Sequence, residues 1–370
     1  MRIGIDGRYI QDHFPGIGRY TYKLVQALAE AAPEDSFVLL YNYELVNTRY
    51  DLERLKAPNM KVVSINLATF SLTEQYRLPS IVRRLRLDLF HSPYYIKPYL
   101  LPCPSVVTIY DLIPRLYPQY TSPWARGIFQ MAIRLATVTS RLVISVSQSA
   151  KEDLVRLLGV LPSKVWVTPL GVDTQFNPAN EKAIFNLRQK HDLPEGYILY
   201  LGINKPHKNL VRLVEAFAKV KIGRKLVLAG KEDPRYREVH EVVKQLSLQD
   251  RVVFSGQVPE DDLPALYSGA ALFVFPSLYE GFGLPLLEAM ACGVPVVCSS
   301  TSSLPEIAGR AAVMVDPLDV SQLARALERV LGDSDLRASM RQEGLKQAAH
   351  FSWERTAKET LGVYRQVLSR

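Results

Sequence analysis

Short apolar runs alternate with longer amphipathic stretches along the second half of the chain. The runs are rich in β-branched and aromatic residues, and stretches of mixed polarity such as 209–220 and 260–268 separate them. Apolar strands that alternate with helices of about 10–15 residues are typical of a parallel sheet covered by helices on both faces. We therefore predict strands at Tyr197–Gly202, Lys225–Gly230, Arg251–Gly256, Ala271–Ser277, Val294–Ser300 and Ala311–Asp316.

The first half repeats this alternation less regularly. The stretch Tyr94–Pro123 is rich in Pro and Tyr and is expected to form extended, functional loops around one strand. Strands are predicted at Arg2–Asp6, Phe37–Tyr41, Lys61–Ile65, Asp88–His91, Ser105–Tyr110 and Leu142–Val146. Helices are predicted at Gly18–Ala31, Ser71–Leu85 and Gln148–Leu158.

The predicted fold class is α/β, with two Rossmann-like, doubly wound domains. A Pro/Gly turn at Pro169–Asp173 marks the boundary, which gives domains 1–170 and 171–352. A last helix within 353–370 is expected to pack back on the first domain. Doubly wound sheets bind ligands outside the carboxyl ends of their strands, so we expect a site in a cleft where the two domains face each other.

Composition and charge indicate where the protein is located and what kind of partner it binds. No apolar stretch is long enough to cross a membrane, and the N-terminus does not resemble a signal peptide. The three cysteines have no metal-like spacing, so we expect a reducing, cytoplasmic location. Most of the net charge of +8 lies in residues 1–170, which predicts an anionic partner for the first domain.

The most specific motif is the segment Pro276–Glu288, which reads PSLYEGFGLPLLE. It predicts a buried strand end, a glycine-containing loop and a helix that begins near Pro285. Backbone N–H groups at such a helix start bind phosphate well, so a diphosphate fits here. Glu280 then lies near a sugar, and Glu288 near ribose hydroxyls. The backbone donors are expected at Gly281, Phe282, Gly283 and Leu284.

The chain resembles the retaining GT-B glycosyltransferases of the group 1, or family 4, type. The motifs that carry the resemblance are Pro15–Tyr20, Val146–Leu154, Pro169–Asp173, Leu201–Leu210 and the two glutamates spaced as in Glu280 and Glu288. The resemblance implies that residues 1–170 bind the acceptor and residues 171–352 bind a nucleotide sugar. It also implies that Glu280 contacts the transferred sugar and that Glu288 binds the ribose.

Cations for the leaving diphosphate are expected directly after the strand that ends at Gly202. Lys208 matches the lysine of the family pattern, but Ile203 stands where the family usually has an arginine. Lys205 or His207 is a candidate replacement. A cation at this position stabilises the charge that develops on the leaving group.

The first domain contributes further candidates. Gly16 and Gly18 open its first helix, and the resemblance implies that they face the donor phosphate; without a full G-x-G-x-x-G they do not support a nicotinamide cofactor. Tyr110 stands where relatives commonly have a histidine, and Asp111 follows it; both are candidate catalytic residues. His91 is a further candidate, although a lone histidine at a strand end is more often structural.

We expect no metal and no cofactor beyond a GDP- or UDP-linked sugar donor. The acidic groups Glu260–Asp262 and Asp333–Asp335 read as helix starts. The basic run Arg77–Arg86 fits either contact with an anionic membrane surface or an ordinary solvated helix face. Nucleic-acid binding is not expected, because no recognised motif accompanies the charge.

The predicted function is transfer of a hexose, with mannose from GDP-mannose as the first interpretation, to a carbohydrate or lipid-linked acceptor in polysaccharide or glycolipid assembly. Transfer from UDP-glucose or another UDP-hexose stays open. Two other classes also stay open: a nucleotide-sugar epimerase, and a non-catalytic protein that binds sugar nucleotides. The departures at Ile203 and Tyr110 favour the non-catalytic alternative, whereas Glu280, Glu288 and Lys208 count against it.

Overall fold

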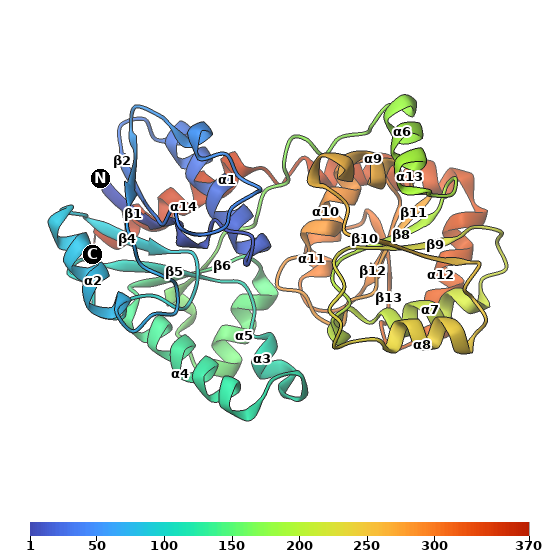
Figure 1. Cartoon of the computed structure of the whole chain (residues 1–370), viewed down its shortest axis with the longest axis horizontal. Helices are drawn as coiled ribbons and strands as arrows, with labels where there is room; N and C mark the ends of the chain where they lie inside the picture. The colour runs from blue at the N-terminus through green and yellow to red at the C-terminus, as the bar shows by residue number, and fades with distance from the viewer. Residues whose placement is uncertain (370) are drawn as a thin grey trace. The chain divides into compact units, whose positions relative to one another are not determined.

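The computed structural model describes residues 1–369, and the chain folds into two compact units. Unit 1 comprises Met1–Gly171 together with the C-terminal segment that begins at Ser352, and unit 2 comprises Val172–Phe351. Figure 1 shows both units with most of their helices and strands labelled. Within residues 1–369, no helix has the length and apolar character needed to cross a membrane.

Unit 1 is built on a seven-stranded parallel sheet with the order β3-β2-β1-β4-β5-β6-β7. Its strands are β1 (Arg2–Asp6), β2 (Ser36–Tyr41), β3 (Met60–Ser64), β4 (Leu89–Ser92), β5 (Ser105–Ile109), β6 (Leu142–Ser145) and β7 (Val165–Val167). Its α-helices are α1 (Pro15–Ala31), α2 (Glu74–Arg84), α3 (Ile113–Leu116), α4 (Pro123–Thr139), α5 (Gln148–Leu158) and α14 (Trp353–Leu368). Short 3₁₀ turns occupy Gly7–Tyr9, Leu52–Leu55, Pro118–Tyr120 and Pro162–Lys164.

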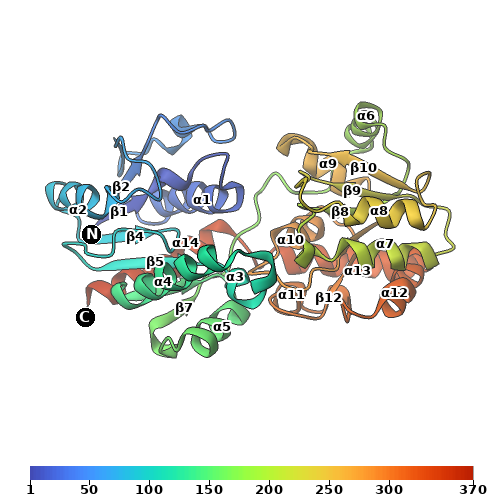
Figure 2. The same ribbon diagram turned by 60° about the horizontal axis from the view of Figure 1, so that its bottom comes forward.

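Helices cover both faces of this sheet, because alternate side chains of each buried strand point to opposite sides. Val107 and Ile109 of β5 pack in a core with Phe129 and Ile133 of α4. On the same face, α2 packs through Leu78 and Val82, and α5 packs through Leu154. The opposite face carries α1 and α14, which lie against each other (Figure 2).

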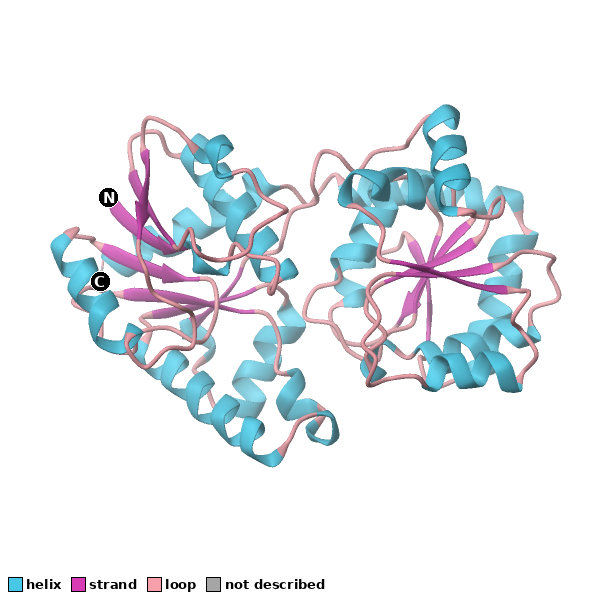
Figure 3. Ribbon diagram, viewed as in Figure 1, coloured by secondary structure: helices cyan, strands magenta, loops and turns pink. Residues whose placement is uncertain are grey.

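Unit 2 is built on a six-stranded parallel sheet with the order β10-β9-β8-β11-β12-β13 (Figure 3). Its strands are β8 (Ile198–Leu201), β9 (Leu226–Ala229), β10 (Val252–Gly256), β11 (Leu272–Phe275), β12 (Val296–Ser299) and β13 (Ala312–Val315). Its α-helices are α6 (Glu181–His191), α7 (Leu210–Lys219), α8 (Glu238–Gln245), α9 (Leu263–Ser268), α10 (Leu284–Ala291), α11 (Leu304–Ala308), α12 (Val320–Gly332) and α13 (Ser334–Ala348). Pro206–Lys208 and Glu260–Asp262 form 3₁₀ turns.

Helix boundaries follow local capping chemistry. The side chain of Ser147 accepts a hydrogen bond from the Ala150 N–H at the start of α5, and Asp333 accepts one from the Leu336 N–H at the start of α13. Gly159, at φ 67°, ends α5 in the left-handed conformation that glycine adopts without a Cβ clash. The expected helix start at Asp333–Asp335 is therefore confirmed.

The predicted α/β class is confirmed, and every predicted strand is present to within a residue or two at each end. Helix α1 begins at Pro15, three residues before the predicted start at Gly18. Residues 94–123, expected as extended loops around one strand, also contain α3 and a 3₁₀ turn. Glu260–Asp262, expected as the first turn of a helix, forms a 3₁₀ turn directly before α9.

Candidate functional site

The loops after β8 and β11 are joined at the carboxyl edge of the unit 2 sheet. The Leu278 N–H donates to the His207 carbonyl oxygen at 2.7 Å. Asn209 is buried at φ 63° and donates its side-chain amide to the carbonyl oxygens of Pro276 and Pro317 at 3.0 and 2.7 Å. A left-handed Asn is tolerated here because its short polar side chain bonds locally. The sequence analysis did not single out Asn209, which holds the two loops together.

Lys208 and Glu280 form an ion pair across these loops. The Lys208 Nζ donates to Glu280 Oε1 at 2.6 Å and to Oε2 at 2.8 Å. Their side chains are 15% and 11% exposed, so the pair is shielded from water but still open to a small ligand. The Lys208 Nζ also lies 5.5 Å from the centre of the Phe275 ring. The structure thus brings together two residues that lie 72 positions apart and that the sequence analysis selected independently.

The glycine-containing loop is held by two serines that follow β12. The Glu280 N–H donates to the Ser302 hydroxyl at 3.0 Å. The buried Ser303 hydroxyl lies 3.0 Å from the Glu280 carbonyl oxygen and 2.7 Å from that of Phe282, and donates to them. Neither serine was selected from the sequence, because each is remote from the loop along the chain. They fix the backbone around Gly281, where a diphosphate is expected.

The loop passes into α10 at Gly283, which caps the helix at φ 111°. A Cβ at this position would lie 2.8 Å from a side-chain carbon of Leu304, so both the conformation and the space require glycine. Leu284 and Pro285 begin the helix, as predicted. The first-turn amides of α10 have no side-chain cap and therefore suit an anion.

Glu288 lies on α10 and is buried, with 3% of its surface exposed. Its Oε2 accepts a hydrogen bond from the Tyr267 hydroxyl of α9 at 2.8 Å. One carboxylate oxygen is thus oriented by Tyr267, a partner that sequence spacing could not indicate. A carboxylate has two oxygens, each of which can accept more than one hydrogen bond.

The candidates for the position of the missing arginine differ in exposure. Lys205 is exposed, and Ile203 contributes its carbonyl oxygen to the Tyr200 hydroxyl at 3.2 Å. His207 is buried, and burial together with Lys208 and Lys205 lowers its pKa to about 3. His207 is therefore uncharged at neutral pH and contributes no cation. Lys205 and Lys208 are the cations that this segment offers.

Gly16 and Gly18 lie in the first turn of α1 in unit 1. This helix has no side-chain cap at Phe14, and Gly16 is exposed with open space around its Cα. A Cβ on Gly18 would lie 3.0 Å from the Tyr9 carbonyl oxygen, so Gly18 allows close packing against the turn after β1. Of the first-turn amides, that of Gly18 donates to the Phe14 carbonyl oxygen at 2.7 Å. Amides at an uncapped helix start, such as that of Gly16, are of the kind that bind anions.

Tyr110 and Asp111 directly follow β5 at the carboxyl edge of the unit 1 sheet. The Tyr110 hydroxyl is buried and makes no hydrogen bond with any residue in 1–369. Its pKa is raised by burial and by the nearby Tyr20, Tyr94 and Tyr9. Asp111 is partly exposed and accepts a hydrogen bond from the Ile113 N–H at 3.0 Å.

His91 occupies a closed position at the end of β4. Its Nδ1 lies 2.6 Å from the Tyr364 hydroxyl of α14, and its Nε2 lies 2.8 Å from the Thr108 hydroxyl of β5. The ring is fully buried, and this burial lowers its pKa to about 3. His91 therefore ties α14 to the sheet as a neutral group, which is the structural role considered above.

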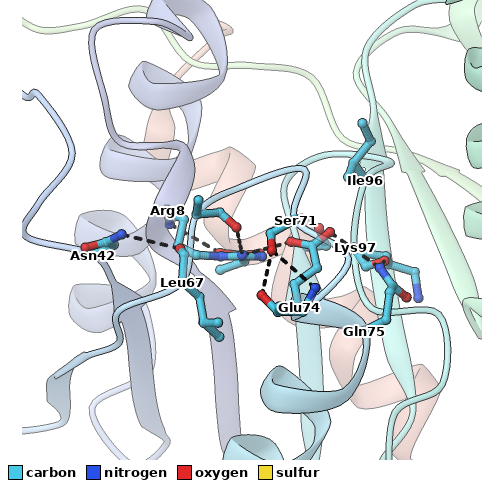
Figure 4. A network of polar contacts seen from close by, with 12 residues as sticks. Arg8, Asn42, Leu67, Ser71, Glu74, Gln75, Ile96 and Lys97 are labelled. Carbon is cyan, nitrogen blue, oxygen red and sulfur yellow. Dashed lines mark hydrogen bonds and ion pairs between the residues drawn. The ribbon is translucent and has the colours of Figure 1, made fainter.

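A second cluster of charges, centred on Arg8, follows β1 in unit 1. The Arg8 guanidinium donates to both carboxylate oxygens of Asp6 at 2.8 and 2.7 Å, and to Glu74 of α2 at 2.8 Å. Figure 4 shows Arg8 reaching Glu74, and Gln75 reaching the carbonyl oxygen of Lys97. This network anchors α2 to the end of β1, and the sequence analysis did not identify it.

The basic run of α2 has its arginines on the solvent side. Arg83, Arg84 and Arg86 are exposed, whereas Val82 is fully buried in the core. Across residues 1–369, no three His, Cys, Asp or Glu side chains are grouped so as to hold a metal ion. Metal-independent activity stays a prediction.

Two family models match the chain. Residues 15–176 match the model described as Glycosyltransferase Family 4, and residues 183–347 match the model described as Glycosyl transferases group 1. The chain therefore belongs to the group 1 and family 4 glycosyltransferases, as the sequence analysis predicted, and its two doubly wound sheets are those of the GT-B fold.

Individual proteins agree with this assignment. The chain is 29% identical to the O-antigen chain mannosyltransferase B of Escherichia coli, over 99% of this chain and 100% of that protein. Its fold is similar to that of a sucrose-phosphate synthase from Thermosynechococcus elongatus, with a TM-score of 0.80, 24% identity and coverage of 100% and 99% of the two chains. It is also similar to Anabaena HepE in complex with UDP and glucose, with a TM-score of 0.76, 21% identity and coverage of 99% and 100%.

Proposed function

We propose that this glycosyltransferase moves mannose from GDP-mannose to a hydroxyl group of a carbohydrate acceptor, with retention of the anomeric configuration. The observation that carries the proposal is the Lys208–Glu280 pair beside the uncapped start of α10. The choice of mannose is supported by the similarity to a mannosyltransferase over nearly the whole chain.

Unit 2 binds the donor in this proposal. The diphosphate lies against the amides of Gly281–Leu284, where the helix start favours negative charge. Lys208 adds a positive charge at the same place: an ammonium has three N–H donors, and its two contacts with Glu280 leave one for a phosphate oxygen. Lys205, which is exposed on the same segment, supplements this charge. Glu288, oriented by Tyr267, accepts from a ribose hydroxyl.

The chemical step breaks the bond between C1 of mannose and the diphosphate oxygen through an oxocarbenium-like state. The electron pair of that bond leaves with GDP, and Lys208 and the loop amides stabilise the charge. The acceptor oxygen then bonds to C1 on the face that the diphosphate leaves, and its proton passes to the leaving phosphate. Glu280 orients sugar hydroxyls and holds Lys208 in place.

Unit 1 contributes the acceptor side. Its cationic surplus favours an acceptor that carries phosphate or is linked to a lipid. The uncapped first turn of α1 at Gly16 offers a further group of amides for an anion. Asp111 and Tyr110 are the polar side chains that follow β5 at the same edge of the sheet.

A calorimetric comparison of donors tests the proposal. GDP and GDP-mannose are titrated into the protein in EDTA, beside UDP, UDP-glucose, ADP and dTDP. We expect GDP-mannose to bind most tightly and to bind without metal. Tighter binding of UDP-glucose would replace mannose by glucose, and no binding of any nucleotide would contradict the enzyme assignment.

A pair of variants places the binding on the proposed residues. Lys208→Ala should weaken binding of GDP by about tenfold, because it removes the cation beside the diphosphate. Lys190→Ala is the matched control: this lysine pairs with Asp262 at 2.7 Å on the surface of unit 2. If both variants lost GDP affinity equally, the loss would come from the change in net charge and not from the proposed site.

A further inference from the structure

Helix α4 of unit 1 is apolar on both sides, although only one side packs against the protein. Its inner face is buried through Phe129, Ala132, Ile133 and Ala136. Its outer face carries five large apolar side chains that are exposed: Trp124, Ile128, Met131, Leu135 and Val138. A helix whose apolar residues extend well beyond its packed face normally has a second surface covering them.

The five outer side chains form one continuous stripe. Their spacing of four, three, four and three residues places them on a single side of the helix. From Trp124 to Val138 the stripe runs along about 21 Å of α4. Figure 1 shows α4 on the outer side of unit 1, beyond the sheet that it covers. An apolar surface of this length marks a contact surface.

Two partners could cover this stripe, a second copy of the chain or a lipid surface, and the charges around the stripe favour the lipid surface. Helix α4 contains no acidic residue, and Arg134 lies beside the stripe at helical spacing. Arg141 follows the helix and is exposed. In a symmetric dimer each patch meets a copy of itself, so these arginines would be brought together without an acidic partner from α4. An anionic lipid surface instead takes up the apolar stripe and neutralises the arginines.

A groove at the C-terminal end of α4 also suits an anionic lipid. It has a volume of about 980 Å³, and its lining includes Val138, Leu161, Arg141 and Lys164 but no acidic side chain. Ser140 also lines it, and its buried hydroxyl makes no hydrogen bond to any residue in 1–369. Two cations and an unpartnered hydroxyl are groups that bind a phosphate, and the apolar walls fit the acyl region beside it.

Helix α2 adds positive charge on the same side of unit 1 as α4. It covers the same face of the sheet as α4, so the outer sides of both helices point away from that face. The exposed Arg83 and Arg84 of α2 therefore extend the cationic surface beyond α4. The basic run of α2 thus lies on the same side of the sheet as the apolar stripe of α4.

We propose that the outer face of α4 docks on an anionic lipid surface, with the stripe Trp124–Val138 in the interface and a lipid phosphate in the groove of Arg141 and Lys164. Docking does not depend on the donor or on sugar transfer. If the acceptor is carried on lipid, docking places enzyme and acceptor on the same surface. This consequence rests on the proposed function.

Vesicle sedimentation of the full chain, without nucleotide, tests the proposal. We expect the protein to bind vesicles of equal parts phosphatidylcholine and phosphatidylglycerol, and to bind pure phosphatidylcholine at least about tenfold more weakly, because several arginines each contribute about fivefold. On binding, the emission of the exposed Trp124 should shift to shorter wavelength. No binding to either kind of vesicle overturns the proposal.

Matched variants locate the contact. Met131→Glu should weaken vesicle binding by at least about tenfold. It replaces an apolar side chain, which lipid would bury on docking, with a negative charge. Phe185→Glu, on α6 of unit 2, is the control: Phe185 is 57% exposed and Met131 is 61% exposed. Both variants should keep the thermal midpoint of the wild type. Equal loss of binding in both variants overturns the assignment to α4.

A second pair tests the groove and the rival partner. Arg141→Ala should weaken binding to the anionic vesicles about fivefold and leave the weak binding to phosphatidylcholine unchanged. Analytical ultracentrifugation without lipid should give the same mass for the wild type and for Met131→Glu. A dimer that Met131→Glu dissociates would assign the stripe to a second copy of the chain and overturn the lipid proposal.

Discussion

The two units each place a cluster of opposite charges at the carboxyl end of their sheet, and the two clusters differ in burial. In unit 1, Arg8 and its partners Asp6 and Glu74 have at most 1% of their side-chain surface exposed. In unit 2, Lys208 and Glu280 keep more than a tenth of theirs. A closed cluster satisfies its own charges and stabilises the fold, whereas a partly open one can exchange its partner for a ligand.

Breaking the closed cluster has the largest expected effect. Arg8→Ala leaves Asp6 and Glu74 buried without their cation and should lower the free energy of unfolding by about 3–5 kcal/mol. Denaturant unfolding measures this change. Arg54→Ala, which removes an exposed pair with Asp51 in the same unit, should cost less than about 1 kcal/mol. A stable Arg8→Ala protein that had lost donor binding would reverse the roles of the two clusters.

Breaking the open cluster should reduce activity and leave the fold intact. Lys208→Ala removes the cation that we propose stabilises the leaving group and should lower kcat by about 10²–10³-fold. Its stability should change by no more than about 1 kcal/mol, since the pair is partly exposed. Steady-state kinetics and thermal unfolding of the same preparation check both statements. Full turnover would remove Lys208 from the site.

His91 tests whether the aromatic region of unit 1 is structural. Burial lowers its pKa to about 3, so the unfolded chain binds a proton below about pH 6.5 that the folded chain does not. Stability therefore falls as the pH falls from about 6.5 towards 3, by on the order of 2 kcal/mol at pH 5. His91→Gln should remove this part of the pH dependence when unfolding is followed between pH 5 and pH 8. An unchanged slope would show that His91 is not the group responsible.

Tyr110 gives the smallest expected effect. Its buried hydroxyl has no hydrogen-bond partner within residues 1–369, so Tyr110→Phe should change stability by no more than about 0.5 kcal/mol. Comparing kcat between the variant and the wild type shows whether the Tyr110 hydroxyl contacts the substrate. Unchanged kcat makes the residue a packing group, and a loss of tenfold or more would show that the hydroxyl reaches substrate during turnover.

The alternation of apolar strands and amphipathic stretches was enough to predict every strand of both sheets except the edge strand β7, because buried parallel strands are apolar throughout. Helix α4 was missed because apolar residues occupy two of its sides. Arg126, Gln130 and Arg134 leave only a narrow polar strip to indicate the helical period. Helices α6 and α12 were also not predicted, although capping residues such as Asn180 and Asp319 mark where they begin.

The candidate site was predictable where residue type and spacing carry the chemistry. Glu280, Glu288 and Lys208 stand in such motifs, and the structure pairs Lys208 with Glu280. The groups that hold them, such as Asn209, Ser303 and Tyr267, depend on contacts between distant segments. Arg8 was missed because an arginine after a strand resembles a solvated turn residue until its burial is known.

The most direct test of the central claim is a transfer assay with GDP-mannose and a mannose-terminated acceptor, comparing the wild type with Glu280→Gln. The account predicts an α-linked mannose product from the wild type, identified by NMR of the new linkage, together with release of GDP. Glu280→Gln should remain folded and lose at least about a hundredfold in rate. A β-linked product would contradict retention, and full activity of Glu280→Gln would contradict the role assigned to the Lys208–Glu280 pair.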